Sequence, residues 1–244
     1  MSVRANEDIP AGTELCVVYN CAEEYVHRCV KLERLMGVPC SCEHCKDDQK
    51  DGMDAHAKRI EMRESVSDRI DTEDWPDWRH PPAAHVAYFK KREKQTLGDI
   101  EEMMETYGSH RDDYRPDLGV FYRDLCGIAN MAVHHNRGPD QIQLFIDASI
   151  GSLRCSGIEL ADDPKPKGKD RSIRQLNGLP IRTLPYTGNE ASIQTMIHLS
   201  VWYSRKKRDQ RTSLAWSKAA ETVAFLTIAP CPKLYKFQFE LVSW

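Results

Sequence analysis

The sequence predicts a mainly α protein, in which a C-terminal region of helical hairpins follows a small β-turn-β segment and a cysteine-rich turn. Most of the chain after residue 82 repeats apolar side chains with helical spacing, which is typical of helices that bury one face. Short polar breaks separate these stretches and favour antiparallel packing of consecutive helices. Strand-like alternation is confined to residues 1–19 and to a tail at 233–244, for which we find no partner strand.

Residues 1–20 predict a turn followed by a strand that ends on a tyrosine. Pro10 and Gly12 suit a type I turn, and the run ELCVVY, which ends at Tyr19, is apolar on both faces. A strand that is apolar on both faces is normally covered by other structural elements on both faces. One or two strands alone, however, are only marginally stable. The pattern therefore indicates one part of a larger sheet.

A short amphipathic helix is expected over residues 22–36, with Gly37 as its stop, and a cluster of cysteines follows it. Cys40, Cys42 and Cys45 fall within six residues. The two-residue spacing of the last pair lets both thiolates face one ion, and Cys40 adds a third sulfur. A tight cluster among nine cysteines is typical of metal binding in a reducing compartment rather than of disulfides, so the pattern predicts zinc.

Structural zinc takes four ligands, and the sequence leaves the fourth one open. His44 adjoins Cys45, so both could bind one ion only with strain. Cys29 is the best local candidate, although a cysteine on a helix face is more often a small buried apolar residue. Four nearby side chains form the set of local candidates: Cys21, His27, Cys29 and His44.

The helical region, residues 51–244, is expected to open with a charged helix over about 53–70 and a longer charged helix near 83–107. Prolines and polar residues predict mobile linkers near 71–82 and 162–187. These breaks divide the region into groups of helices.

Helices with clean apolar faces are predicted at 121–132 and 142–153, where RGP between them supplies a stop glycine and a start proline. Thr187 and Glu190 form a capping box that opens another helix, and a return helix begins with Leu214 on its apolar face. We expect these helices to stack as antiparallel hairpins, although the sequence shows no repeat of the kind that marks solenoid proteins.

The composition is that of an ordinary soluble protein, with 41% hydrophobic and 29% charged residues. A net charge of -3 disfavours nucleic acid as a partner. The basic run YSRKKRDQR at 203–211 could contact phosphate or act as a nuclear import signal, but a solvated turn is the simpler interpretation. No apolar run is long enough to span a bilayer and no signal-peptide pattern is present, so we expect a cytoplasmic or nuclear protein with no membrane partner.

Four features follow one another between residues 3 and 45. They are an acidic-Ile-x-x-Gly turn, a Glu-Leu strand that ends in a tyrosine, a short helix with Arg28 and Leu32, and the segment GVPCSCEHC. This order resembles the end of a SET domain with its post-SET segment. The likeness covers under a fifth of the chain. The helical remainder is similar in character to the C-terminal helical domains of SET and MYND-domain methyltransferases.

The resemblance implies a protein related to enzymes that transfer a methyl group from S-adenosylmethionine to a lysine of a protein substrate. Tyr19 matches the catalytic tyrosine, whose hydroxyl would orient the lysine amine in line with the methyl donor. Cys40, Cys42 and Cys45 match the post-SET zinc ligands, and the family's fourth ligand comes from an Asn-His-Ser-Cys segment. The implied cofactors are therefore zinc and S-adenosylmethionine. The implied domains are the SET end at 1–20, the post-SET segment at 21–50 and the helical domain at 51–244.

The sequence departs from the family pattern in two ways. Val38 stands where the family usually has an aromatic residue, and neither the Asn-His-Ser-Cys segment nor the glycine-containing cofactor segment occurs. We therefore expect that the cofactor-binding half is lacking and that the chain is inactive alone, and the cofactor-binding residues stay unknown. The alternative is a zinc-stapled helical module that binds a peptide of a partner protein and has no enzymatic role.

Overall fold

The structure is a computed structural model of the 244-residue chain. It describes residues 25–37, 39, 43–72, 82–110, 115–134, 139–161, 179–181 and 190–227. In chain order, its elements are α1 (Tyr25–Met36), α2 (Glu43–Asp51), α3 (Met53–Thr72), α4 (Pro82–Glu105), the 3-10 turn η1 (Pro116–Leu118), α5 (Gly119–His134), α6 (Pro139–Cys155), α7 (Glu190–Trp202), the π-helical turn η2 (Tyr203–Lys207) and α8 (Gln210–Thr227). Within these ranges the only β pairing is a single antiparallel bridge between Leu160 and Ile181, so the predicted mainly α class is confirmed.

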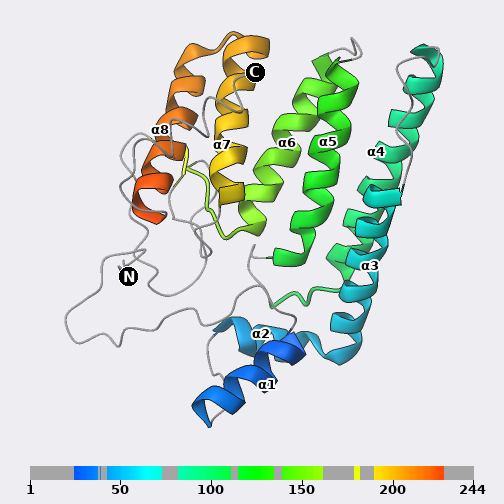
Figure 1. Ribbon diagram of the computed structural model, residues 1–244, viewed down its shortest axis with the longest axis vertical. Helices are drawn as coiled ribbons and strands as arrows, with labels where there is room; N and C mark the ends of the chain where they lie inside the picture. Colours follow the sequence, from blue (N-terminus) through cyan, green and yellow to red (C-terminus); the bar gives the residue numbers. More distant parts are fainter. Residues whose placement is uncertain are drawn as a thin grey trace.

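The helices are arranged as a row of hairpins. Figure 1 shows α4 to α8 standing side by side, with α3 alongside α4 and with α1 and α2 at the lower end of the row. Consecutive helices pack as the pairs α3 with α4, α5 with α6 and α7 with α8, and α4 and α6 also contact the next pair. The antiparallel hairpins expected from the apolar periodicity are therefore present. In the described ranges, no helix combines the length and hydropathy needed to cross a bilayer.

The ends of α1 and α2 lie at glycines in the left-handed region. Gly37 follows α1 with φ 71, as the sequence predicted for a stop, and Gly52 separates α2 from α3 with φ 87. The sequence pattern predicts no helix between the cysteine cluster and residue 53, whereas the structure has a helix from Glu43 to Asp51. This helix has no apolar stripe, because the side chains that it buries are Cys45, Asp48 and Asp51.

The largest group of buried apolar residues joins α6, α7 and α8. It includes Ile146, Met196 and Trp216, and it also contains Ile181 from the bridged segment. Residues 179–181 fall in the range expected to be a mobile linker, but Ile181 is fully buried and Ala161 donates its N–H to the Pro180 carbonyl. These three residues lie against the core, and the mobility of the linker near 162–187 stays a prediction. Leu214 was also expected on the buried face of α8, and it is 58% exposed.

Gly151 marks a close approach of α6 to α5. A Cβ at Gly151 would lie 2.5 Å from the Tyr122 ring, whereas a Cβ at Gly98 of α4 would meet nothing within 4 Å. We predict that Gly151→Ala lowers the free energy of unfolding by about 1–3 kcal/mol, because the ring must shift in a packed site. Gly98→Ala should raise it by about 0.5–1 kcal/mol through helix propensity alone. Urea denaturation measures both changes, and stabilisation by both alanines would contradict the close approach.

Candidate functional site

The structure describes one of the four site residues predicted from the sequence. Cys45 lies in the first turn of α2, and it is 4% exposed. Tyr19, Cys40 and Cys42 lie outside the described residues, as do the predicted strand before α1 and the strand-like tail. The described part of the site is therefore built around Cys45 and its neighbours.

Helices α1, α2 and α3 meet beside Cys45. The Tyr25 ring of α1 stacks on the His56 ring of α3, with centroids 4.8 Å apart and planes 22° apart. His56 Nε2 lies 2.7 Å from the backbone carbonyl oxygen of Asp48, three residues after Cys45. Because a carbonyl can only accept, His56 must carry its proton on Nε2 and donate it. This bond and the ring stack hold the three helices together at one point.

Tyr25 also contacts a second cysteine. Cys29 follows Tyr25 by one helical turn and is a half-buried free thiol. Burial raises the pKa of Tyr25 to about 12, aided by a side-chain hydrogen bond with Cys29 and by the charges of Cys45 and Asp48. The phenol is consequently neutral at physiological pH, and Cys29 and Cys45 both interact with the same side chain.

The donor types at this point fit a zinc ion. Zinc prefers thiolate and imidazole ligands, and the cysteines here are half-buried at Cys29 and buried at Cys45, in a partly water-excluded setting. Within the described residues, no group of three or more His, Cys, Asp or Glu side chains is arranged to hold a metal ion. Two of the three predicted zinc ligands, Cys40 and Cys42, lie outside those residues, so only Cys45 of the predicted set belongs to the described part of the chain.

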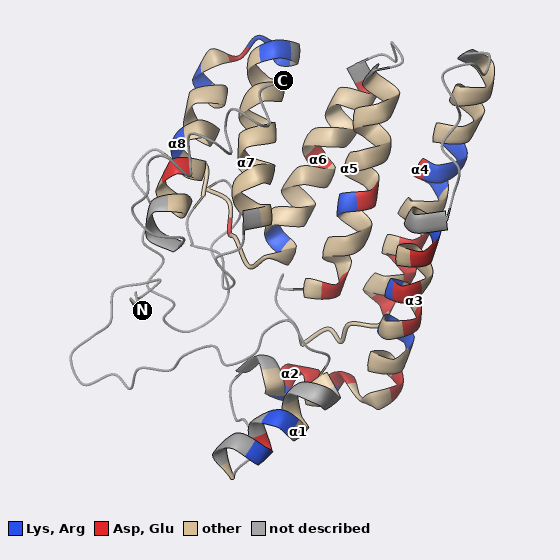
Figure 2. Ribbon diagram, viewed as in Figure 1, with Lys and Arg blue, Asp and Glu red and all other residues tan. Residues whose placement is uncertain are grey.

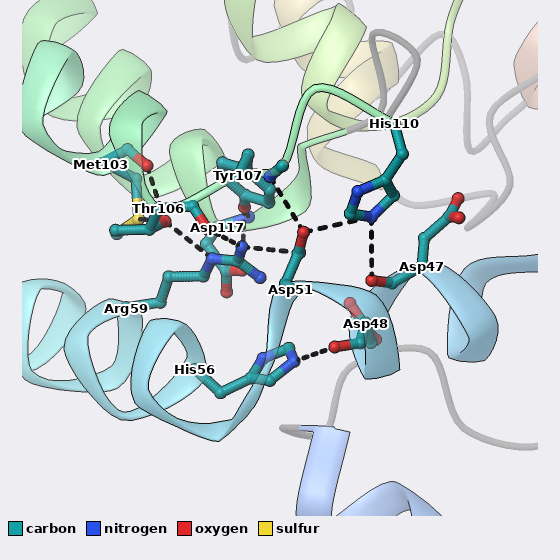
Figure 3. A network of polar contacts seen from close by, with 11 residues as sticks. Asp47, Asp48, Asp51, His56, Arg59, Met103, Thr106, Tyr107, His110 and Asp117 are labelled. Atoms are coloured by element: carbon teal, nitrogen blue, oxygen red, sulfur yellow. Dashed lines mark hydrogen bonds and ion pairs between the residues drawn. The ribbon is translucent and has the colours of Figure 1, made fainter.

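A buried carboxylate attaches α2 to the helical row. Asp51 is the last residue of α2, and its side chain is 0% exposed. Its Oδ2 accepts a hydrogen bond from Arg59 Nη2 at 2.6 Å, and its Oδ1 accepts one from the Gly108 N–H at 3.0 Å. His110 Nε2 lies 3.3 Å from the same Oδ1. Figure 3 shows that these donors reach Asp51 from α3 and from the segment after α4.

Arg59 extends this network toward η1. Its Nε donates to Thr106 Oγ1 at 2.8 Å, and its guanidinium carbon lies 3.8 Å from the centroid of the Tyr107 ring, a cation–π distance. The Tyr107 hydroxyl donates to Asp117 at 2.9 Å. Burial first and the Asp117 charge second raise the pKa of Tyr107 far above its ordinary value. Figure 3 therefore traces one polar path from α2 to η1.

Sequence reasoning did not identify this network. Asp51 and Arg59 belong to stretches that look like solvated helix faces, and Tyr107 belongs to no periodic pattern. The Arg59–Asp51 spacing of eight residues is one weak local signal, because residues just before and just after a helix break can face each other. The Thr106 and Gly108 partners are too distant in sequence to be identified in this way.

A second buried ion pair lies between α4 and α5. Arg92 Nη2 donates to Asp124 Oδ1 at 2.8 Å, and Thr96 Oγ1 donates to Asp124 Oδ2 at 2.7 Å. The Arg92 and Asp124 side chains are 1% and 2% exposed. This group is remote in the fold from α1 and α2, and it serves to join two helices of the row.

The basic run forms the turn between α7 and α8, where Figure 2 shows Lys and Arg gathered at the top of the row. Arg208 adopts the left-handed region with φ 56, and Asp209 caps α8 by accepting the Thr212 N–H at 3.0 Å. Hydrogen bonds from Thr212 lower the pKa of Asp209. Arg205 and Lys207 are exposed, as in the solvated turn that the sequence predicted.

Comparison with known proteins identifies no relative. No family model matches the chain, and no curated protein and no solved structure matches it either.

Proposed function

We propose that residues 3–45 form the end of a SET domain with a zinc-binding post-SET turn, and that the helical row is the domain that flanks it. The observation that carries this assignment is the position of Cys45. The last cysteine of the family-like spacing is buried in the first turn of α2, and Asp51 at the other end of α2 is fixed to the helical row. A metal bound at this turn would thus be rigidly attached to the row.

Each predicted site residue has a role in this proposal. Cys40, Cys42 and Cys45 bind one zinc ion, which cross-links the turn and supplies no chemistry at the substrate. Tyr19 orients the amine of a substrate lysine for methyl transfer from S-adenosylmethionine. The residues that bind this cofactor in the family have no counterpart in the motifs of this sequence. We therefore assign methyl transfer to a complete SET domain and expect none from this chain alone.

Metal analysis tests the zinc assignment. The chain, purified under reducing conditions without chelator, should contain about one zinc per molecule. A strong chelator should lower its melting temperature, and added zinc should restore it, because a metal that binds only the folded state stabilises that state. Cys45→Ser should lose the metal, whereas Cys126→Ser should keep it, since Cys126 bonds Ser149 between α5 and α6. Absence of metal from the original chain would refute the assignment.

Calorimetry with S-adenosylmethionine tests the other half of the proposal. We expect no heat of binding at micromolar cofactor, because the motifs with which the family binds this cofactor do not occur in this sequence. Binding with a micromolar Kd would show that the chain holds a cofactor site of its own and would contradict our assignment.

One observation favours the alternative function of an interaction module. Helices in a single row present a long continuous surface, which is how helical-repeat proteins bind peptides, and Figure 1 shows such a row. Sequencing of full-length transcripts separates the two functions. A reading frame that includes an upstream Asn-His-Ser-Cys segment would favour the methyltransferase, and its absence would favour the module.

A further inference from the structure

The point at which α1 approaches α2 is defined by contacts that involve no metal. Tyr25 and Cys29 are four residues apart and share one face of α1. Cys45 lies three residues before Asp48 on α2. His56 stacks on Tyr25 and donates to the backbone carbonyl of Asp48, so it joins α1 to this turn of α2. Cys29 and Cys45 therefore each lie within about one helical turn of the residues that meet at His56.

The environment of Tyr25 agrees with this placement. After burial, a side-chain hydrogen bond with Cys29 and the charges of Cys45 and Asp48 help to raise the pKa of Tyr25. These three groups therefore belong to the surroundings of the Tyr25 phenol. Cys45 is buried and Cys29 is half-buried, so an ion between them would be shielded from much of the solvent.

We propose that Cys29 supplies a thiolate to the same metal ion as Cys45 and thereby acts as the fourth zinc ligand. This inference rests on the zinc binding proposed above and adds a ligand that the cysteine spacing does not contain. Binding replaces the Cys29 S–H bond with a sulfur–zinc bond and releases the proton to solvent. The Tyr25 hydroxyl is placed to donate to the bound sulfur, which is the kind of outer contact that orients metal ligands.

Cobalt(II) substitution tests this ligand, because the intensity of the thiolate-to-cobalt charge-transfer band increases with the number of bound thiolates. We expect the original chain, kept reduced, to give the spectrum of a tetrahedral site with four sulfurs. Cys29→Ser should lower the band by roughly a quarter, as one thiolate of four is lost. It should also raise the metal Kd at least about tenfold, since even the loss of an outer contact has that effect. Cys126→Ser is the matched control and should change neither quantity.

A second measurement needs no variant. Zinc should slow the alkylation of Cys29 by iodoacetamide in the original chain, as read by mass spectrometry of the digested protein. Cys126 is an internal reference, because burial raises the pKa of its thiol to about 11 and keeps it unreactive with or without zinc. Equal alkylation rates for Cys29 with and without zinc would overturn the inference.

The outcomes separate the two proposals. Failure of the original chain to bind cobalt or zinc would refute the zinc-binding turn itself. Cobalt binding with a spectrum and Kd that Cys29→Ser leaves unchanged would refute only the role of Cys29. In that case the same spectra of Cys21→Ser, His27→Ala and His44→Ala would identify the fourth ligand among the remaining local candidates.

Discussion

Replacing Asp51 with alanine is expected to lower the free energy of unfolding by about 3–5 kcal/mol, because removal of one partner strands a buried charge. The Arg59 side chain is 2% exposed, so water cannot replace the carboxylate. One nitrogen of Arg59, Nη1, already has no hydrogen-bond partner among the described residues. The partly buried N–H of Gly108 would lose its acceptor as well, and a donor left without an acceptor adds to the loss.

Asp47→Ala is the matched control, because it removes the same side chain from the same helix. Asp47 forms an ion pair with Lys50 at 3.0 Å, but both side chains are substantially exposed. Exposed pairs of this kind contribute at most about 1 kcal/mol. Urea denaturation of the two variants gives the comparison, and similar small effects would show that Arg59 does not depend on Asp51.

The loss of stability expected for Asp51→Ala should be concentrated in one part of the molecule. Asp51 joins α2 to α3 and to the segment after α4, so its removal should loosen α1 and α2 before the rest of the row. Hydrogen exchange should then rise in α2 and change little in α7 and α8, whose core contains no part of this network. A uniform rise in exchange over all helices would contradict this local attachment.

The sequence predicted the elements whose stability comes from apolar burial. Phe121 and Ile128 repeat at helical spacing and are both fully buried, and the same logic locates α6 and α7. It fails for α2, because the side chains that α2 buries are Cys45, Asp48 and the Asp51 carboxylate. A helix held by polar tertiary bonds has no periodicity for a sequence analysis to detect.

The candidate site divides in the same way. Cys45 could be proposed as a zinc ligand from the sequence, because its spacing to the neighbouring cysteines is typical of metal binding. The proposed role of Cys29 depends on how α1 is placed against α2, where Tyr25 stacks on His56 and His56 donates to the Asp48 carbonyl. Arg59 and Thr106 are 47 residues apart. Contacts of that kind follow from the fold as a whole, so no local pattern indicates them.

Asp124→Ala is the second substitution with a large expected effect, again about 3–5 kcal/mol, because it removes the carboxylate that faces the buried Arg92 guanidinium. Thr96 loses the same acceptor, but a helical threonine can turn to the carbonyl one turn earlier. At 1% exposure, the Arg92 guanidinium cannot turn to water. Most of the loss should therefore come from the desolvated charge, and thermal or urea unfolding of the variant measures it.

The double variant Arg92→Met with Asp124→Leu decides whether charge or packing causes that loss. Replacing a whole buried ion pair by apolar side chains of similar volume is often neutral or stabilising by about 1–4 kcal/mol. Although it carries more changes, the double variant should thus be more stable than Asp124→Ala, and it should fold even if the single variant does not. If instead the double variant is as unstable as the single one, the helices α4 and α5 are joined by the shape of these side chains. In that case, an uncompensated charge on Arg92 would not be the cause of the destabilisation by Asp124→Ala.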